Sequence, residues 1–292
     1  MSISAEDEPD EPSEQFVEMD DTGRYGRYSD LLGSGSSKKV YRGFDLVEGV
    51  EIAWNQIDVD YDKPETLERP YSEVRYLRDI HHENIIRLYS YWTDEKNHKF
   101  NFITEICTSG SLRDFRAKHR NVSIRALKKW SLQILRGLDY LHNHNPCIIH
   151  RDLNCSNIFI NGNTGEVMIG DFGLATAMSN ELSVHTTMVG TPEFMAPEQF
   201  NECYTEGIDI YSFGFCVLEM VTREIPYSEC DNLPRIFKRV TNGVKPKSLQ
   251  RVEPEIQKFI EKCIAPYKDR PTASELLEDP FFQGIDGDDN DD

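Results

Sequence analysis

Three short motifs in a fixed order constrain this chain of 292 residues more than any other feature of its sequence. Residues 150–157 read HRDLNCSN, residues 171–173 read DFG and residues 196–198 read APE. Each motif alone arises often by chance. Together, behind a glycine-containing loop and a strand-rich segment, they are specific, because unrelated loops rarely repeat all three in this order.

This set of motifs resembles that of the protein kinases. Phosphoryl transfer needs a carboxylate that orients the acceptor hydroxyl and takes up its proton, and Asp152 fits that role. It also needs hard oxygen ligands for Mg²⁺, which Asn157 and Asp171 offer as an amide oxygen and a carboxylate. We therefore expect a protein kinase fold with ATP and Mg²⁺ as cofactors.

The order of the predicted elements favours an α+β, bilobal fold, with a small strand-rich lobe before a large helical lobe. Alternating patterns predict three strands between residues 28 and 58 and two more over 85–92 and 100–104. Helical patterns predict four further elements: a helix over 64–79, one behind an N-cap at Ser123, a buried one over 207–222, and one opened by a capping box at Thr272–Glu275.

Acidic residues gather at both ends of the chain, whose formal net charge is −19. Residues 1–21 hold nine Asp or Glu and no Lys or Arg, and residues 286–292 hold five Asp. Such runs repel themselves and bury little surface. We predict disordered acidic tails, which either keep the chain soluble or serve in docking or regulation. The predicted boundaries are 1–24 and 284–292 for the tails and 25–283 for the kinase domain, with lobes of about 25–105 and 108–283.

Composition also bears on partners and location. The acidic surplus argues against nucleic acid or an anionic membrane as the main partner. No apolar run approaches the 18 residues of a membrane span, and the N-terminal residues lack the features of a secretory signal. The seven cysteines are scattered and odd in number, which predicts reduced thiols and a cytoplasmic or nuclear protein.

The glycine loop over residues 33–40 reads GSGSSKKV, with Lys38 where a third glycine is usual. Gly33 and Gly35 let backbone N–H groups approach phosphate oxygens closely. Ser36 at the loop tip either adds a hydroxyl contact or is a simple turn residue.

The third strand carries a second anomaly. Protein kinases have a phosphate-binding lysine there, whereas this chain has the neutral Asn55. Either the protein is inactive or another lysine serves. Side chains alternate along a strand, so Lys38 shares the face of Val40, which is the adenine-facing residue in the usual pattern, and Lys39 points away. We expect Lys38 to project into the cleft with Glu73 as its partner; the alternative is a pair of solvated surface lysines.

A lysine moved from the third strand to the glycine-loop strand resembles the with-no-lysine (WNK) Ser/Thr kinases. The runs that resemble the plant branch are 41–45 (YRGFD), 53–56 (AWNQ), 190–198 (GTPEFMAPE) and 226–230 (PYSEC). The resemblance covers about residues 28–282. It implies ATP, Mg²⁺ and protein substrates with Ser or Thr acceptors.

The resemblance also implies roles for single residues. Lys38 becomes the phosphate-anchoring lysine, and Asp152 and Asp171 become the catalytic and metal carboxylates. The adenine-binding hinge comprises Thr104, Glu105, Ile106 and Cys107, and the activation-loop phosphorylation sites are Ser183 and Thr187.

Further residues are expected to support the fold and the loop. Glu198 and Arg270 should form a buried ion pair, and Asp209 should accept hydrogen bonds from the backbone of the catalytic loop. Arg151 should pair with a phosphate on the activation loop, whereas His142 is expected to be an ordinary histidine.

Two departures from the family pattern affect the expected activity. Asn154 replaces a lysine that contacts the transferring phosphate in the family, so the chemical step should be slowed. Phe172 replaces a leucine that lines an inhibitory chloride pocket in animal members, so we expect little chloride inhibition. The first departure keeps an alternative function open, a nucleotide-binding pseudokinase that acts as a scaffold.

Overall fold

The structure is a computed structural model that describes residues 15–35, 38–63, 65–177, 190–201 and 204–285. The chain forms two compact units. The first holds the residues up to Val59 together with Tyr89–Ile106, and the second holds Asp60–Leu88 together with the chain from Cys107 onward. The backbone therefore passes between the units three times, after Val59, after Leu88 and after Ile106.

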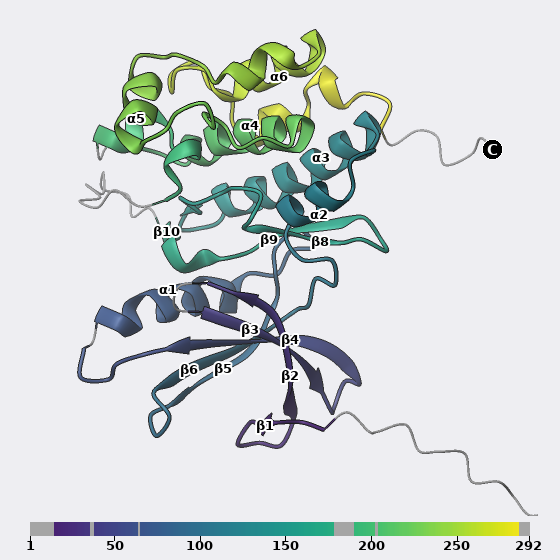
Figure 1. Ribbon diagram of the computed structural model, residues 1–292, viewed down its shortest axis with the longest axis vertical. Helices are drawn as coiled ribbons and strands as arrows, with labels where there is room; N and C mark the ends of the chain where they lie inside the picture. The colour runs from purple at the N-terminus through teal and green to yellow at the C-terminus, as the bar shows by residue number, and fades with distance from the viewer. Residues whose placement is uncertain (1–14, 36–37, 64, 178–189, 202–203, 286–292) are drawn as a thin grey trace, which may run out of the picture. The chain divides into compact units, whose positions relative to one another are not determined.

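The first unit is built on a six-stranded sheet with the strand order β1-β2-β3-β4-β6-β5 (Figure 1). Its strands are β1 (Glu18–Met19), β2 (Tyr25–Ser34), β3 (Lys38–Asp45), β4 (Val50–Asp58), β5 (Leu88–Asp94) and β6 (Lys99–Thr104). Strands β2, β3 and β4 confirm the three strands predicted between residues 28 and 58. The strand predicted over 85–92 begins later, because Ile85 instead bridges to Ile169.

One hydrophobic cluster of this unit lies on one face of the sheet. Ile52 and Trp54 of β4 are fully buried, and Trp54 packs edge-on against Trp92 with 4.9 Å between ring centroids. Because side chains alternate along a strand, Asn55 faces the other side. Asn55 lies directly opposite Val40 of β3, so the two share that second face.

The sheet begins earlier in the chain than the sequence predicts. In β1, Glu18 lies opposite Arg27 of β2 and accepts a hydrogen bond from its Nε at 2.8 Å. The ring of Phe16 packs against an aromatic ring of β2, with 4.9 Å between centroids. The predicted tail over 1–24 is therefore wrong for residues 15–24, because an ion pair and a ring contact hold this acidic segment on the sheet. The residues before it lie outside the described ranges.

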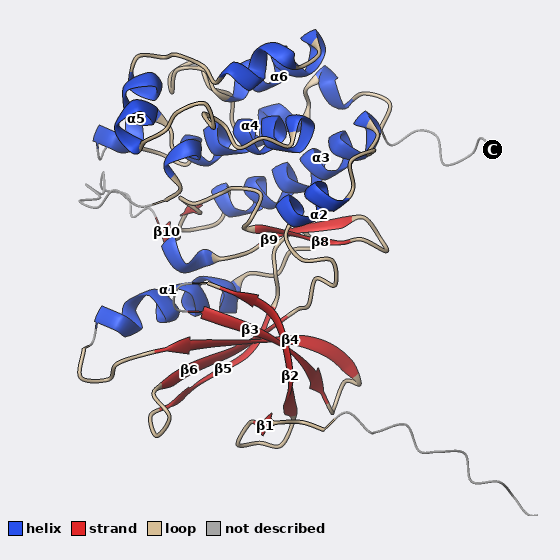
Figure 2. Cartoon of the chain, viewed as in Figure 1, coloured by secondary structure: helices blue, strands red, loops and turns tan. Residues whose placement is uncertain are grey.

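The second unit is mostly helical (Figure 2). Its helices are α1 (Glu65–Asp79), α2 (Leu112–Lys118), α3 (Ile124–His142), α4 (Gly207–Thr222), α5 (Leu233–Thr241), α6 (Pro254–Cys263) and α7 (Ala273–Leu277). Its short strands are β7 (Ile148–Ile149), β8 (Ile158–Asn161), β9 (Glu166–Ile169) and β10 (Thr176–Ala177), paired as β7 with β10 and β8 with β9. Its 3₁₀ turns are η1 (Phe172–Leu174), η2 (Pro192–Phe194), η3 (Pro197–Asn201), η4 (Lys247–Arg251) and η5 (Pro280–Phe282). The predicted α+β class is confirmed.

Local sequence accounts for where these helices begin. The Ser123 side chain accepts a hydrogen bond from the backbone of Ala126 and caps α3, as predicted. Thr272 and Glu275 form the predicted capping box of α7. Helix α4 is buried along nearly its whole length, which its apolar sequence predicts. Within the described ranges, no helix has both the length and the apolar character needed to cross a membrane.

Helix α1 belongs to the second unit, although the sequence analysis placed it in the first lobe. Leu77 of α1 is 1% exposed and joins the hydrophobic cluster that contains Phe172. The hydroxyl of Tyr76 accepts a hydrogen bond from the backbone of Ala177 at 3.0 Å. Residues 60–88 therefore pack with the second unit, whereas the predicted lobe boundaries stay a prediction.

The second unit also runs slightly past its predicted end. Ile285 is 4% exposed and lies in the hydrophobic cluster of the second unit, although the predicted tail starts at residue 284. Ile285 follows the buried Phe281 and Phe282, so the same cluster holds the chain up to this residue. Residues 286–292 lie outside the described ranges.

Candidate active site

The carboxylate of Asp152 is the centre of a hydrogen-bonded cluster in the second unit. Its Oδ1 atom accepts hydrogen bonds from the Thr191 backbone N–H at 2.8 Å and from the Thr191 hydroxyl at 2.7 Å. Its Oδ2 atom accepts a hydrogen bond from Asn157 Nδ2 at 3.1 Å. These contacts hold the carboxylate in one orientation, as a group that positions an acceptor hydroxyl requires. The sequence analysis did not single out Thr191 for this role.

Gly190 makes the contact between Thr191 and Asp152 sterically possible. Its φ angle is +118°, a conformation that favours glycine. A Cβ atom at this position would lie 2.7 Å from the carbonyl oxygen of Arg151. A larger residue would therefore push the chain away from the catalytic loop.

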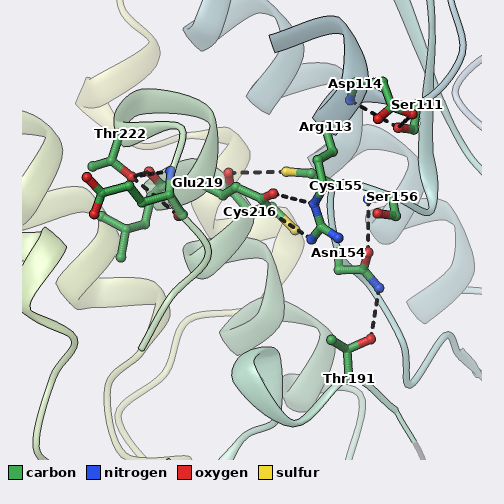
Figure 3. Close-up of polar contacts among 12 residues, drawn as sticks. Ser111, Arg113, Asp114, Asn154, Cys155, Ser156, Thr191, Cys216, Glu219 and Thr222 are labelled. Carbon is green, nitrogen blue, oxygen red and sulfur yellow. Dashed lines mark hydrogen bonds and ion pairs between the residues drawn. The ribbon is translucent and has the colours of Figure 1, made fainter. Parts of the chain in front are cut away.

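Asn154 is enclosed by its neighbours (Figure 3). Its side-chain nitrogen donates to the Thr191 hydroxyl at 3.2 Å and to the Asp152 carbonyl oxygen at 3.0 Å. Its side-chain oxygen accepts a hydrogen bond from the backbone of Ser156 at 2.9 Å. The residue is only 3% exposed. Asn154 thus fastens the catalytic loop to Thr191 but brings no charge to Asp152.

Asn157 and Asp171 lie at the two ends of the β8–β9 hairpin. The carbonyl oxygen of Asn157 accepts a hydrogen bond from Gly170, the residue before Asp171, at 2.9 Å. The Asn157 side-chain nitrogen donates only to Asp152, which leaves its side-chain oxygen without a hydrogen bond to the described residues. Asp171 has a φ angle of +59°. A spare amide oxygen near a carboxylate fits the donor set of a Mg²⁺ site.

The described residues contain no group of three His, Cys, Asp or Glu side chains that could hold a metal ion by themselves.

The buried carboxylate of Asp209 holds the backbone of the catalytic loop. It accepts hydrogen bonds from the backbone N–H of His150 at 2.8 Å and of Arg151 at 2.9 Å. His142 Nε2 lies 3.1 Å from the same carboxylate. Burial acts to raise the pKa of Asp209, but the interactions with His142 and His150 outweigh burial and lower the pKa. His142 was missed as a supporting residue, because no local pattern links the end of α3 to the start of α4.

The side chain of Arg151 is also engaged. Its Nε donates to the carbonyl oxygen of Leu174, and its Nη1 lies 3.4 Å from the Tyr204 hydroxyl. The predicted phosphorylation sites Ser183 and Thr187 lie outside the described residues. The pairing of Arg151 with a phosphate therefore stays a prediction.

Two further residues support the segment that follows residue 190. Arg270 donates to both carboxylate oxygens of Glu198 and, at 2.7 Å, to the carbonyl oxygen of Gly207. The Arg270 side chain is 1% exposed. A buried charge of this kind is stable only with its partner, so the pair ties this segment to α4.

Phe172 is fully buried and lies edge-on to His150, with 5.0 Å between ring centroids. His150 Nε2 lies 2.9 Å from the carbonyl oxygen of Gly170. The Phe172 ring, which directly follows Asp171 in the chain, is therefore packed into the hydrophobic core beside His150.

In the first unit, Lys38 reaches across the face of the sheet that carries Val40. Its Nζ lies 4.7 Å from the centre of the Phe102 ring. Phe102 and Val40 flank Asn55 in one row across β6, β4 and β3. The Lys38 ammonium group therefore lies over the row that contains Asn55. Lys38 is half-buried whereas Lys39 is exposed, which agrees with the alternation argument.

Asn55 itself is buried and hydrogen-bonded. It is 4% exposed, and its side-chain nitrogen donates to the Thr104 hydroxyl at 3.0 Å. In the glycine loop, a Cβ atom at Gly33 would meet no heavy atom within 4 Å, and Gly35 donates to the carbonyl oxygen of Lys38 at 2.7 Å. Open space above Gly33 suits the close approach of a phosphate. Ser36 lies outside the described residues.

The predicted hinge coincides with a passage between the units. Strand β6 ends at Thr104, and the chain leaves the first unit after Ile106. Glu105, Ile106 and Cys107 have no regular secondary structure and are half-exposed. Glu73 is 4% exposed on α1 in the second unit, so its pairing with Lys38 of the first unit stays a prediction.

Comparison with known proteins identifies the family. The protein kinase domain family matches residues 27–282. The probable serine/threonine-protein kinase WNK5 of Oryza sativa subsp. japonica is 60% identical over 282 residues, which cover 95% of this chain and 86% of that protein. Serine/threonine-protein kinase WNK8 of Arabidopsis thaliana is 55% identical over 270 residues, which cover 91% of this chain and 48% of that protein. The chain belongs to the protein kinases and, among them, to the with-no-lysine (WNK) serine/threonine kinases of plants.

Proposed function

We propose that this chain transfers the γ-phosphate of ATP to Ser and Thr hydroxyls of protein substrates, with Lys38 as the lysine that binds the phosphates. The main observation behind this proposal is the hydrogen-bonded cluster around Asp152. A carboxylate held by Thr191 and Asn157 is suited to orient an acceptor hydroxyl and to take its proton during transfer.

The first unit supplies the nucleotide contacts. The backbone at Gly33 and Gly35 takes the phosphates, and Ser36 adds a hydroxyl. Val40 and the hinge of Thr104, Glu105, Ile106 and Cys107 take the adenine. The Lys38 ammonium group lies over the row of Val40, Asn55 and Phe102. This position supports the proposal that Lys38 replaces the lysine that is missing from the third strand.

Asn157 and Asp171 are the residues that would hold Mg²⁺. When bound, the ion neutralises charge on the phosphate oxygens. The Asn157 side chain donates to Asp152 through its nitrogen, so its oxygen is available as a ligand for the ion. Asp171 contributes the negative charge that a divalent ion needs.

A second candidate function is a nucleotide-binding pseudokinase that acts as a scaffold. Asn154 favours it, because a neutral and enclosed amide stands where the family has a lysine. The absence of that charge predicts a slow chemical step without loss of nucleotide binding. A kinase of reduced activity is the intermediate case, in which phosphate is transferred but slowly.

The test is a transfer assay with radiolabelled ATP, Mg²⁺ and a general protein acceptor, followed by identification of the labelled amino acid. We expect labelled Ser or Thr with the wild type and a loss of about 10³ or more with Asp152→Asn. If the wild type binds ATP but labels no acceptor, the scaffold function replaces the kinase function.

Regulation and location follow as parts of the same proposal. Phosphates on Ser183 or Thr187 would pair with Arg151 and order the activation loop. The scattered cysteines, odd in number, favour a reducing compartment, the cytoplasm or the nucleus.

A further inference from the structure

An arginine of α2 lies beside the catalytic loop with a buried carboxylate as its partner. Arg113 Nε and Nη2 donate to the two carboxylate oxygens of Glu219 on α4, the second at 3.1 Å (Figure 3). This bidentate geometry fixes the plane of the guanidinium group. The third nitrogen, Nη1, makes no hydrogen bond to the described residues.

The two partners differ in their access to solvent. The Arg113 side chain is 30% exposed, whereas the Glu219 side chain is 6% exposed. Burial acts to lower the pKa of Arg113, but its interactions with Glu219 outweigh burial and raise that pKa. The pair therefore presents a positive charge to an approaching molecule, although its net charge is zero.

Two contacts place Arg113 next to the residues around Asp152. Its backbone N–H donates to the carbonyl oxygen of Cys155, the residue after Asn154, at 3.0 Å. Its guanidinium carbon lies 5.8 Å from the ring centre of Phe194. Phe194 belongs to the turn that follows Thr191, which binds Asp152. A peptide whose hydroxyl reaches Asp152 therefore has flanking residues near the guanidinium group.

Within the part of the chain that the structure describes, the side chains nearest to Arg113 do not cancel this charge. Asn154 and Ser156 of the catalytic loop are uncharged. The carboxylate of Asp114 accepts a hydrogen bond from the Ser111 hydroxyl at 2.7 Å, and Figure 3 shows it turned toward that residue. Glu219 is the carboxylate in contact with Arg113, and it is the less exposed partner.

We propose that Arg113 selects acceptor peptides by charge: it favours an anionic side chain, a carboxylate or a phosphate, close to the acceptor hydroxyl, and it rejects a basic one. The inference rests on the proposed kinase function and adds a substrate class to it. Glu219 is the positioning partner, and loss of Arg113 would leave a lone carboxylate at the same place.

The experiment uses the full chain and peptides that differ at one position near a single acceptor. At each position within four residues of the acceptor, the series carries Glu, phosphoserine, Gln or Lys. We expect the wild type to favour Glu and phosphoserine over Lys by about tenfold in kcat/KM at one position or more, with a smaller preference at high salt. In Arg113→Met, Lys should be favoured over Glu, and Arg113→Lys should retain the original preference.

Lys118→Met is the matched control, because it removes one positive charge from an exposed position of the same helix. It should leave the preference unchanged. If Arg113→Met fails to fold, the double variant with Glu219→Met replaces it, since no buried charge is then left alone. That variant should show no preference between Glu and Lys.

The same peptides are tested for binding by fluorescence anisotropy, which needs no catalysis. Product formation with the same charge preference in the wild type and in Arg113→Met overturns the inference and leaves the kinase function intact. If no peptide is phosphorylated, the kinase function fails and the binding assay tests the inference by itself. Tighter binding of anionic peptides by the wild type, lost in Arg113→Met, would support the inference. Equal affinities of the wild type for anionic and basic peptides would overturn it.

Discussion

Replacing Lys38 with methionine tests the lysine exchange most directly. Methionine keeps most of the length of the side chain and removes its charge. Lys39→Met is the matched control, because the neighbouring lysine is exposed on the other side of β3. Both variants change the net charge equally, so a difference between them reports the position of the charge.

Two magnitudes separate a catalytic role of Lys38 from a structural one. The ammonium group lies 4.7 Å from the Phe102 ring centre, and such a cation–π contact contributes about 0.5–1 kcal/mol at a partly exposed site. The expected fall in Tm is therefore no more than about 4 °C. Loss of one preorganised charge on the transferring phosphates costs about 10²–10³ in rate, or about 3–4 kcal/mol.

The assay measures kcat/KM with radiolabelled ATP together with thermal unfolding of each variant. We expect Lys38→Met to lose at least about 10² in kcat/KM with a small change in Tm, and Lys39→Met to keep most of its activity. Equal losses in the two variants would refute the assignment of the strand faces. Full activity of Lys38→Met would show that another cation binds the phosphates.

Three further changes test other parts of the site. Asn154→Lys should raise kcat by about tenfold with a smaller change in the Kd of ATP, because it adds a cation where Asn154 now binds Thr191; an unchanged kcat would place the defect elsewhere. Asp209→Asn should lower stability by about 2–3 kcal/mol in thermal unfolding, since the charged acceptor of two backbone hydrogen bonds is lost. Because the folded-state pKa of Asp209 is lowered, its stabilisation is present above about pH 4 and is lost as the pH falls further, so the two proteins should converge in acid; a constant difference would contradict this. Wild-type activity should be nearly flat between low and physiological chloride at constant ionic strength, and Phe172→Leu should make it more sensitive; strong inhibition of the wild type would contradict the role of the buried ring.

Residues that perform chemistry could be picked out from the sequence because their types and spacing are fixed together. Asp152, Asn157 and Asp171 stand in two short motifs, and the motifs imply a loop and a hairpin that bring them near one another. The alternation of side chains along a strand was also informative. It depends only on the local backbone, and it predicts that Lys38 and Lys39 lie on opposite faces of the strand. These inferences use residues that are close in sequence or a pattern that repeats along one strand.

The remaining features depend on contacts between distant segments. His142 reaches Asp209 only because α3 and α4 pack together, and no pattern near either residue indicates this contact. The pairing of Arg113 with Glu219 likewise joins α2 to α4. The same reason explains the errors at the domain boundaries: composition marks residues 15–24 as a tail, whereas the pairing of Glu18 with Arg27 across β1 and β2 places them on the sheet.

The contacts of Asp152 have a stereochemical consequence for proton transfer. A carboxylate offers about four lone-pair sites, two on each oxygen. Thr191 occupies both sites of Oδ1 with its backbone N–H and its hydroxyl, and Asn157 occupies one site of Oδ2. Among the described residues no further donor bonds to Oδ2, so an incoming hydroxyl finds a vacant site on that oxygen. The proton of the acceptor should always arrive at that oxygen, so the substrate approaches Asp152 from a single direction.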